Sequence, residues 1–415
     1  MPETAPRDVA IVLSGGGING ILLELGFLKR LREDALWSRV GWIYGTSAGA
    51  LSGAMAALDR LGELEEFLLE LRPEEVFRPR RVWQLPLGGL HDYTLPGTIT
   101  ERLDADETLG SALAACKIEL IVFATDVSEP IDGDRSRDFE LVYSSHTTPP
   151  HTMGQAILAS AAVSAIVLPV RVDGAVATDG GWVRNFPLEH AYRNPSVEAI
   201  AAFRYISSYP PVDVSFLERL RERLERFRAV PPVRALIAEL RLAEERWRRG
   251  EPAHYPELIA RLMRVAINRN TFLEERFAEE RDLSVDELRR LRDEVISTSV
   301  AAAAPWRRRR LERDLAEQFS GARFPFGHER HVPRLVVRAT AGEDALESTF
   351  RGDPPWSEES KRALIARGYC LADEELAESA TFAPSDSRGR LGPGQAVGPH
   401  AGGGSGPGAP GPDRD

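Results

Sequence analysis

The chain has 415 residues, more than one domain usually needs, so it can bury a substantial core and still carry an insertion or a tail. Its formal charge of −11 at pH 7 argues against a dedicated nucleic-acid-binding protein, because such proteins present a net basic face to phosphates. Hydrophobic residues make up 43% of the chain and charged residues 28%, which excludes a fully disordered protein.

Cysteine content and hydropathy favour a cytoplasmic location. Cys116 and Cys370 are the only cysteines, too few for a disulfide framework. The apolar run at residues 9–13 is too short for the core of a signal peptide. No uninterrupted apolar stretch approaches the roughly 20 residues that a membrane-spanning helix needs. We therefore expect a cytoplasmic protein whose only contact with a membrane is peripheral.

The beginning of the chain predicts two consecutive β-loop-α units. Residues 9–13 form a β-prone run that ends in a glycine turn, and leucines at helical spacing follow it. Residues 40–44 repeat the β-prone run, and after a second glycine turn the small residues at 50–58 suit a helix. Two such units predict an α/β fold, with three α/β/α layers around a mainly parallel central sheet.

Later apolar runs predict additional strands. Three of them lie at residues 118–123, 197–203 and 335–337. Residues 167–172 and 175–178 flank an Asp-Gly pair, which readily supplies the positive φ angles of a tight hairpin turn.

From about residue 214 to residue 319 the chain becomes rich in arginine, glutamate, leucine and alanine, and its apolar residues recur at helical spacing. This pattern predicts a helical insertion over residues 212–320. Ser284 and Glu287 within it form a capping-box pattern, which predicts that a helix starts there.

Residues 45–49 match the pattern G-x-S-x-G, in which a sharp strand-to-helix turn projects a serine hydroxyl clear of the sheet. Gly45 and Gly49 allow the turn, and Ser47 is the candidate nucleophile. The pattern also occurs by chance in ordinary turns. Here the preceding β-prone run and the following helix-compatible run favour the nucleophile.

Gly15, Gly16 and Gly17 follow the first predicted strand and offer backbone N–H groups at the mouth of a helix, where negative charge is favoured. Such a loop can bind an oxyanion. With Gly20 it also matches the dinucleotide-binding fingerprint G-x-G-x-x-G. That alternative requires an acidic residue near the end of the second strand, where this chain has Ser47 instead.

A serine nucleophile needs a base, and Asp179 is the best candidate. Gly180 and Gly181 follow it and let the backbone approach another element closely. A plain surface turn is the alternative for this Asp-Gly-Gly segment. The order Ser47, Asp179, His190 would also fit a Ser-Asp-His triad, although a surface or capping histidine is the simpler interpretation of His190.

With these motifs in this order, the chain resembles the patatin-like phospholipases. Their signature is a glycine-rich oxyanion loop, a G-x-S-x-G elbow and a later D-G-G or D-G-A segment. Residues 159–162, Asn185 and Pro187 are also similar to family positions. The resemblance covers roughly residues 8–187, with a weaker echo at residues 335–369.

The resemblance implies a lipid acyl hydrolase with a Ser47–Asp179 dyad. Gly15, Gly16, Gly17 and the Ala48 amide would form the oxyanion hole, and neither a metal nor a cofactor would take part. The expected substrates are acyl esters of phospholipids or related lipids. Alternatives are an acyltransferase or thioesterase with the same dyad, or a catalytically weak lipid-binding regulatory protein.

Two positions depart from the family pattern. Asn19 stands where the family commonly has a basic residue, and Ser164 where a proline is common. Two segments combine features of a lipid contact with plainer interpretations. Residues 306–310 combine a tryptophan with four arginines but fit a solvated helix face better, and residues 82–87 fit either an acyl entrance or a packed loop.

The motifs divide the chain into four expected parts. Residues 1–211 hold the catalytic core, and the helical insertion over residues 212–320 follows. Residues 321–382 complete the same domain. Residues 383–415, rich in glycine and proline, form a disordered tail.

Overall fold

The computed structural model describes residues 6–72, 75, 77–79, 91–93, 107–128, 139–162, 169–206, 215–252, 255–321, 332–340 and 357–379. By its contacts the chain divides into two units, residues 1–382 and 383–415, and every described residue lies in the first. The predictions made for residues 82–87, Ser164 and the tail fall outside the described residues.

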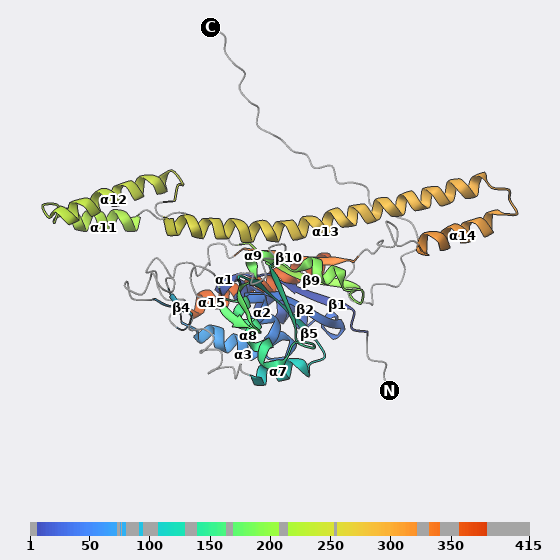
Figure 1. The fold of residues 1–415 in the computed structure, drawn as a ribbon, viewed down its shortest axis with the longest axis horizontal. Coiled ribbons are helices and arrows are strands. Elements are labelled where there is room, and N and C mark those ends of the chain that lie inside the picture. Colours follow the sequence, from blue (N-terminus) through green and yellow to red (C-terminus); the bar gives the residue numbers. More distant parts are fainter. Residues whose placement is uncertain are drawn as a thin grey trace, which may run out of the picture. The chain divides into compact units, whose positions relative to one another are not determined.

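A mixed sheet of mostly parallel strands forms the centre of the first unit (Figure 1). Its strands follow the order β10-β9-β1-β2-β5-β8-β7, and β6 also pairs with β5. The strands are β1 Val9–Leu13, β2 Val40–Thr46, β5 Glu119–Asp126, β6 Glu140–Ser144, β7 Val170–Val172, β8 Ala175–Asp179, β9 Ala199–Tyr205 and β10 Arg334–Ala339. Pairing is parallel from β10 to β5 and antiparallel for β6, β7 and β8. The predicted α/β architecture is confirmed.

Two pairs of short antiparallel strands are found among the described residues. The predicted hairpin is β7–β8, and its turn residues Asp173 and Gly174 have φ angles of 48° and 85°. A separate antiparallel pair joins β3 Phe77–Pro79 to β4 His91–Tyr93.

The parallel strands are buried on both faces because their side chains alternate between two apolar clusters. In β1, Val9, Ile11 and Leu13 belong to the larger cluster, whereas Ala10 and Val12 belong to the smaller one on the opposite face. Helices therefore have to cover both faces of the sheet.

The larger cluster is covered by helices from several parts of the chain (Figure 1). They are α1 Gly17–Arg32, α2 Ala48–Ala57, α3 Leu61–Glu70, α7 Glu107–Ala114, α8 Pro150–Ser160 and α15 Glu358–Glu378, with the 3₁₀ turn η1 Ala35–Arg39 between α1 and β2. Helices α1 and α15 meet at backbone distance, since a Cβ on Gly26 or on Gly368 would overlap the other helix. The residues after the insertion thus return to pack on the first helix of the chain.

Helix α10 Leu188–Arg193 and the long helix α13 Tyr255–Ala302 contribute side chains to the smaller cluster, and the short helix α9 Gly181–Arg184 precedes α10 in the chain. Helix α13 contacts both α9 and α10, and Ala278 supplies a buried side chain to the cluster. The third layer of the fold therefore includes part of the helical insertion.

The helical insertion serves as the crossover between two neighbouring parallel strands, β9 and β10. Such a connection is needed because the end of one parallel strand and the start of the next lie at opposite ends of the strands. Within it the described chain forms α11 Ser215–Glu225, α12 Pro231–Arg248, α13 and α14 Arg308–Gly321. The predicted helical character of this segment is confirmed.

The predicted helix start at Ser284 is wrong, because Ser284 lies inside α13. Its hydroxyl donates to the Glu280 carbonyl at 2.8 Å instead of accepting a hydrogen bond from a first-turn amide. Val285 next to it is buried, so tertiary packing holds the helix together through this polar turn.

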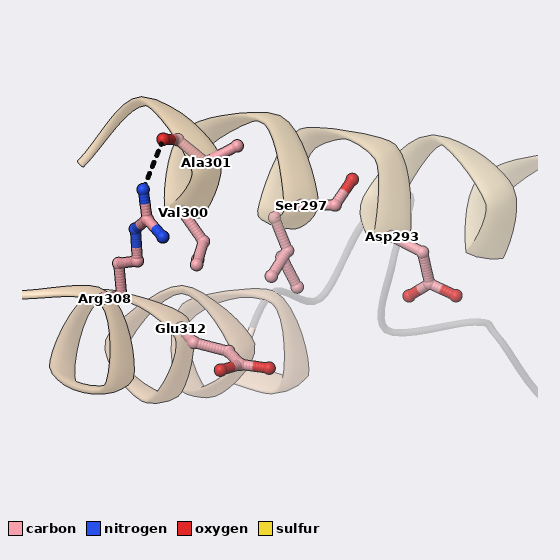
Figure 2. A pocket seen from close by; sticks show the side chains of 7 residues that line it. Asp293, Ser297, Val300, Ala301, Arg308 and Glu312 are labelled. Carbon is pink, nitrogen blue, oxygen red and sulfur yellow. Dashed lines mark hydrogen bonds between the residues drawn. The ribbon is translucent and has the colours of Figure 1, made fainter. Parts of the chain in front are cut away.

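A hollow of about 470 Å³ lies between the C-terminal part of α13 and α14 (Figure 2). Its lining includes Asp293, Ser297, Arg308 and Glu312 but neither of the two candidate catalytic residues. Among the described helices, none combines the length and the apolar character needed to cross a bilayer.

Candidate active site

Ser47 occupies the sharp turn between β2 and α2, with φ 54° and ψ −115°. Non-glycine residues rarely adopt a positive φ, and such conformations persist only where the surroundings impose them. Glycines make this turn possible. A Cβ on Gly45 would overlap the Gly49 carbonyl, and a Cβ on Gly49 would lie 2.6 Å from the Leu13 carbonyl oxygen.

The Ser47 hydroxyl donates a hydrogen bond to Asp179, with 2.7 Å between Oγ and Oδ2. Both residues are buried, and their side chains come together from positions 132 residues apart. The second carboxylate oxygen of Asp179 accepts the Gly181 N–H at 2.7 Å. Burial raises the pKa of Asp179 to about 6, although the hydrogen bonds from Ser47 and Gly181 oppose that shift.

The backbone around Asp179 is fixed by the strand pairing of β8 with β5. The Thr125 hydroxyl donates to the Asp179 carbonyl at 2.8 Å, and the Asp179 N–H donates to the Ala162 carbonyl at 2.9 Å. These bonds fix the carboxylate at the end of its strand, where it faces the elbow.

Ser160 holds the elbow from a third direction, a role that its sequence position alone does not reveal. Its hydroxyl accepts the Ser47 N–H at 2.8 Å and donates to the Phe123 carbonyl at 2.5 Å. The Ser47 amide is therefore already occupied within the protein.

The glycine loop lies directly against Ser47, since a Cβ on Gly15 would be 3.2 Å from the Ser47 Cβ. The Gly15 N–H donates to the Asn185 carbonyl at 3.0 Å. This bond positions the loop and occupies the N–H that Gly15 was expected to offer to an oxyanion. Gly20 closes the first turn of α1 by donating to the Gly16 carbonyl at 2.9 Å.

The N–H groups of three expected oxyanion donors lie at the start of a helix or directly before it. Gly17 and Ala48 are the first residues of α1 and α2, and Gly16 precedes α1. The first N–H groups of a helix have no intrahelical partner. Within the described residues, no hydrogen bond is found for the N–H groups of these three residues.

His190 lies away from the Ser47–Asp179 pair. Its Nε2 is 3.0 Å from Glu140 Oε1, and its ring packs on Phe123 with centroids 4.7 Å apart. The described hydrogen-bond partners of the Asp179 carboxylate are Ser47 and Gly181. The alternative of a Ser-Asp-His triad thus has no support from this geometry.

Two other sequence expectations concern Asn19 and metal binding. Asn19 is buried on the first turn of α1. Among the described residues, no group of three or more histidine, cysteine or acidic side chains has an arrangement that could hold a metal ion.

Comparison with known proteins assigns one segment of the chain to a family. A family model described as patatin-like phospholipase matches residues 11–192. Residues 11–192 form a patatin-like phospholipase domain. The family comprises lipid acyl hydrolases, and the matched segment includes the glycine loop, the elbow and the Asp-Gly-Gly segment.

Two further comparisons add little to this assignment. No curated protein matches the chain. The crystal structure of VipD from Legionella pneumophila aligns with 90% of this chain and 67% of its own, at 12% sequence identity and a TM-score of 0.39. That similarity is too low to support an argument about function.

Helix α13 lies outside the matched segment yet touches the site of the patatin-like domain. Asn185, whose carbonyl accepts the Gly15 N–H, donates through its side-chain amide to the Thr271 hydroxyl at 2.7 Å. Thr271 in turn donates to the Ile267 carbonyl at 3.0 Å. Because Asn185 and Thr271 are both buried, α13 supports the glycine loop through a single intervening residue.

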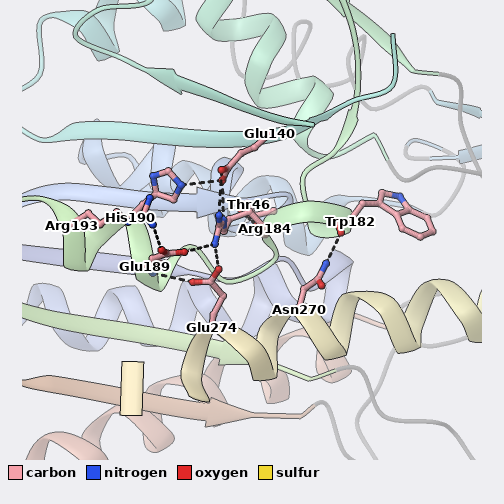
Figure 3. A network of polar contacts seen from close by, with 9 residues as sticks. All are labelled: Thr46, Glu140, Trp182, Arg184, Glu189, His190, Arg193, Asn270 and Glu274. Carbon is pink, nitrogen blue, oxygen red and sulfur yellow. Dashed lines mark hydrogen bonds and ion pairs between the residues drawn. The ribbon is translucent and has the colours of Figure 1, made fainter. Parts of the chain in front are cut away.

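A network of charged side chains makes a second connection from α13 to the patatin-like domain (Figure 3). The Arg184 carbonyl accepts a hydrogen bond from the Thr46 hydroxyl at 2.7 Å, next to Ser47. The Arg184 guanidinium contacts Glu140 at 2.9 Å, Glu189 at 3.0 Å and Glu274 of α13. Glu274 also accepts the Glu189 N–H at 3.0 Å.

Ionisation in this network follows from its mutual contacts. Burial by itself would raise the pKa of Glu140, but hydrogen bonds with His190 and Arg184 hold it at about 2. Burial opposes the charge on Arg184, whereas its carboxylate partners raise its pKa above the usual value. Glu140 and Arg184 are therefore charged at neutral pH, whereas burial raises the pKa of Glu274 despite its contact with Arg184. Neither Thr271 nor Glu274 was singled out by the sequence motifs.

Proposed function

We propose that the protein hydrolyses carboxylic esters of lipids through an acyl-enzyme on Ser47, with Asp179 as the base. The observation that carries the proposal is the 2.7 Å hydrogen bond from the buried Ser47 hydroxyl to the Asp179 carboxylate. A serine hydroxyl is a weak nucleophile, and an adjacent base that accepts its proton activates it.

In the proposed reaction the Ser47 Oγ attacks the ester carbonyl carbon while Asp179 takes the hydroxyl proton. The carbonyl oxygen becomes an oxyanion, and the N–H groups of Gly16, Gly17 and Ala48 stabilise it. The intermediate then expels the alcohol, which receives the proton from Asp179. Water, deprotonated by Asp179, attacks the acyl-enzyme, releases the fatty acid and restores Ser47.

Two features of the site favour this assignment. The pKa of Asp179, raised to about 6, brings the carboxylate closer to the operating pH that suits a general base. The N–H groups of Gly17 and Ala48 lie at the starts of two helices, whose dipoles favour negative charge.

The test is hydrolysis of a panel of short and long acyl esters and phospholipids by the wild type, Ser47→Ala and Asp179→Asn. We expect each variant to keep the wild-type circular dichroism spectrum and to lose activity at least about 10³-fold. A fluorophosphonate should label the wild type but not Ser47→Ala. A folded wild type that neither hydrolyses any ester nor reacts with the fluorophosphonate would refute the proposal.

The same assay separates hydrolysis from acyl transfer. Adding an alcohol as a competing acceptor and quantifying free acid against the new ester shows which acceptor the acyl-enzyme prefers. Release of mainly free acid is the expected result.

A further inference from the structure

Helix α13 has apolar side chains on two opposite faces. Thr271, Ala278 and Val285 are buried on the side that meets the patatin-like domain. On the other side, Leu262 and Val265 are each 54% exposed. A helix with one partner usually shows one apolar stripe, so the second face indicates a second binding partner.

The exposed side changes its charge along the helix. Among the exposed residues, those in 258–273 include one arginine, Arg269, and no acidic residue, whereas those in 274–295 include six acidic residues and two arginines. An apolar face combined with a cationic residue and no acidic one suits a helix that lies on an anionic membrane surface. Residues 258–273 have this character, and residues 274–295 do not.

We define the docking face by five exposed residues of the first half: Leu258, Leu262, Val265, Arg269 and Leu273. Their spacing of four, three, four and four residues places them on one side of the helix. We propose that this docking face binds the surface of an anionic lipid bilayer. The choice of a bilayer rests on the proposed function, since a lipid hydrolase has to reach its substrate at such a surface.

A second copy of the chain fits this face less well. The exposed residues from Leu258 onward follow the alternating four- and three-residue spacing of a coiled-coil seam, which passes through Arg269, Arg276 and Glu279. A dimer would bury these charged groups at the seam, at a cost in stability. At a bilayer, arginine side chains lie along apolar surface and extend their guanidinium groups toward lipid phosphates.

The position of the docking face brings a bilayer close to the catalytic machinery. Thr271, which contacts Asn185 beneath the glycine loop, lies two residues from Arg269 on the same helix. The two sides of α13 are separated by about one helix diameter, roughly 10 Å. Docking would therefore place lipid head groups near the helix that supports the glycine loop.

The experiment measures binding of the full chain to phosphatidylcholine vesicles with and without phosphatidylserine by flotation. The Ser47→Ala variant serves as the reference, so that no lipid is consumed during the measurement. We expect it to bind the phosphatidylserine vesicles, more weakly at high salt, and to bind pure phosphatidylcholine vesicles at least about tenfold less tightly.

Two substitution pairs on the same helix locate the contact. In the Ser47→Ala background, Val265→Asp and Arg269→Glu should each weaken binding to phosphatidylserine vesicles at least about tenfold. The matched controls Val295→Asp and Arg290→Glu lie in the acidic half, where Val295 is 47% exposed and the Arg290 side chain 68%. Neither control should change binding. Thermal melting of all four variants verifies that they are folded.

The results separate this inference from the proposed function. Absence of binding to phosphatidylserine vesicles would overturn the inference, even if the wild type hydrolyses soluble esters. Equal losses in the Val265→Asp variant and its Val295→Asp control would overturn it as well. If Val265→Asp instead converts a dimer to a monomer in analytical ultracentrifugation, the face is an interface between two copies. Vesicle binding without any ester hydrolysis would leave the inference standing and defeat the proposed function.

Discussion

The elbow around Ser47 and helix α13 both help to position the candidate active site, but they use different physical means. At the elbow, glycines let backbone segments approach so closely that side chains are excluded, and the geometry follows from sterics. Helix α13 reaches the site through side chains alone, by the Thr271–Asn185 hydrogen bond and the Glu274–Arg184 ion pair. The elbow should therefore tolerate no substitution, whereas contacts from α13 should have graded effects.

The largest effect is expected for Gly45→Ala. The new methyl group would overlap the Gly49 carbonyl and displace Ser47 from Asp179, and such a displacement costs about 10²-fold or more in kcat/KM. The control is Gly62→Ala in α3, where a Cβ meets no atom within 4 Å and alanine should stabilise the helix by about 0.5–1 kcal/mol. Ester hydrolysis and thermal melting are the measurements. Full activity in Gly45→Ala would show that the elbow is less rigid than its contacts indicate.

The next effect is the pH dependence of the Asp179 base. With its pKa raised to about 6, Asp179 has to lose its proton to act, so kcat/KM should rise about tenfold per pH unit below 6 and level off above it. A midpoint near pH 4 in the pH–rate profile would contradict burial of the carboxylate.

The same shift affects stability, with a definite sign. A folded-state pKa above the unfolded value of about 3.9 means that Asp179 favours folding at low pH, and this contribution is lost as pH rises from about 4 to 6. Asp179→Asn should therefore raise the free energy of unfolding above that of the wild type at pH 8, by about 1–3 kcal/mol. The difference should shrink below pH 5 in urea unfolding.

A smaller effect is expected for Glu274→Ala in α13. The substitution removes one carboxylate from Arg184 and leaves the Glu189 N–H without its acceptor, which should lower the free energy of unfolding by about 2 kcal/mol. Glu280→Ala is the control. Glu280 forms an ion pair with Arg276 of its own helix, but both side chains are at least 60% exposed. The free energy of unfolding should therefore fall by less than about 0.5 kcal/mol. Equal losses would show that the buried pair has no special role.

The smallest effect is expected for Thr271→Val. The variant keeps the shape of the side chain but leaves the Asn185 amide without its acceptor, at a cost of about 1 kcal/mol. If the lost hydrogen bond lets Asn185 and the glycine loop shift, kcat should drop about fivefold with little change in KM. Thr271→Ser, which keeps the hydroxyl, should restore kcat. A Thr271→Ser variant as slow as Thr271→Val would point to the lost packing of the methyl group instead.

The sequence revealed the parts of the protein whose structure is coded locally. The order of strand, glycine turn and helix around residues 15–17 and 45–49 predicted both β-loop-α units, because glycine spacing and β-prone runs are local signals. It did not reveal that the Gly15 N–H is taken by Asn185, since that bond joins positions far apart in the chain.

The support from α13 was hidden for a related reason. Glu274 and Thr271 stand in a helical pattern rich in charged residues, where an acidic side chain usually faces solvent. Its long-range partners, Arg184 and the Glu189 N–H, distinguish Glu274 from Glu280. Ser284 shows the opposite failure, since its capping pattern is a local signal that packing of the surrounding helix overrides.

The position of α13 in the chain has a consequence for how the protein is made. Ser47 and Asp179 leave the ribosome long before Thr271 and Glu274 do, because synthesis runs from the N-terminus. Strand β10, which completes the parallel edge of the sheet, follows later still. A nascent chain can thus bring Ser47 and Asp179 together before the helix that supports the glycine loop exists. A growing polypeptide would therefore complete the support of this site only after α13 has been synthesised.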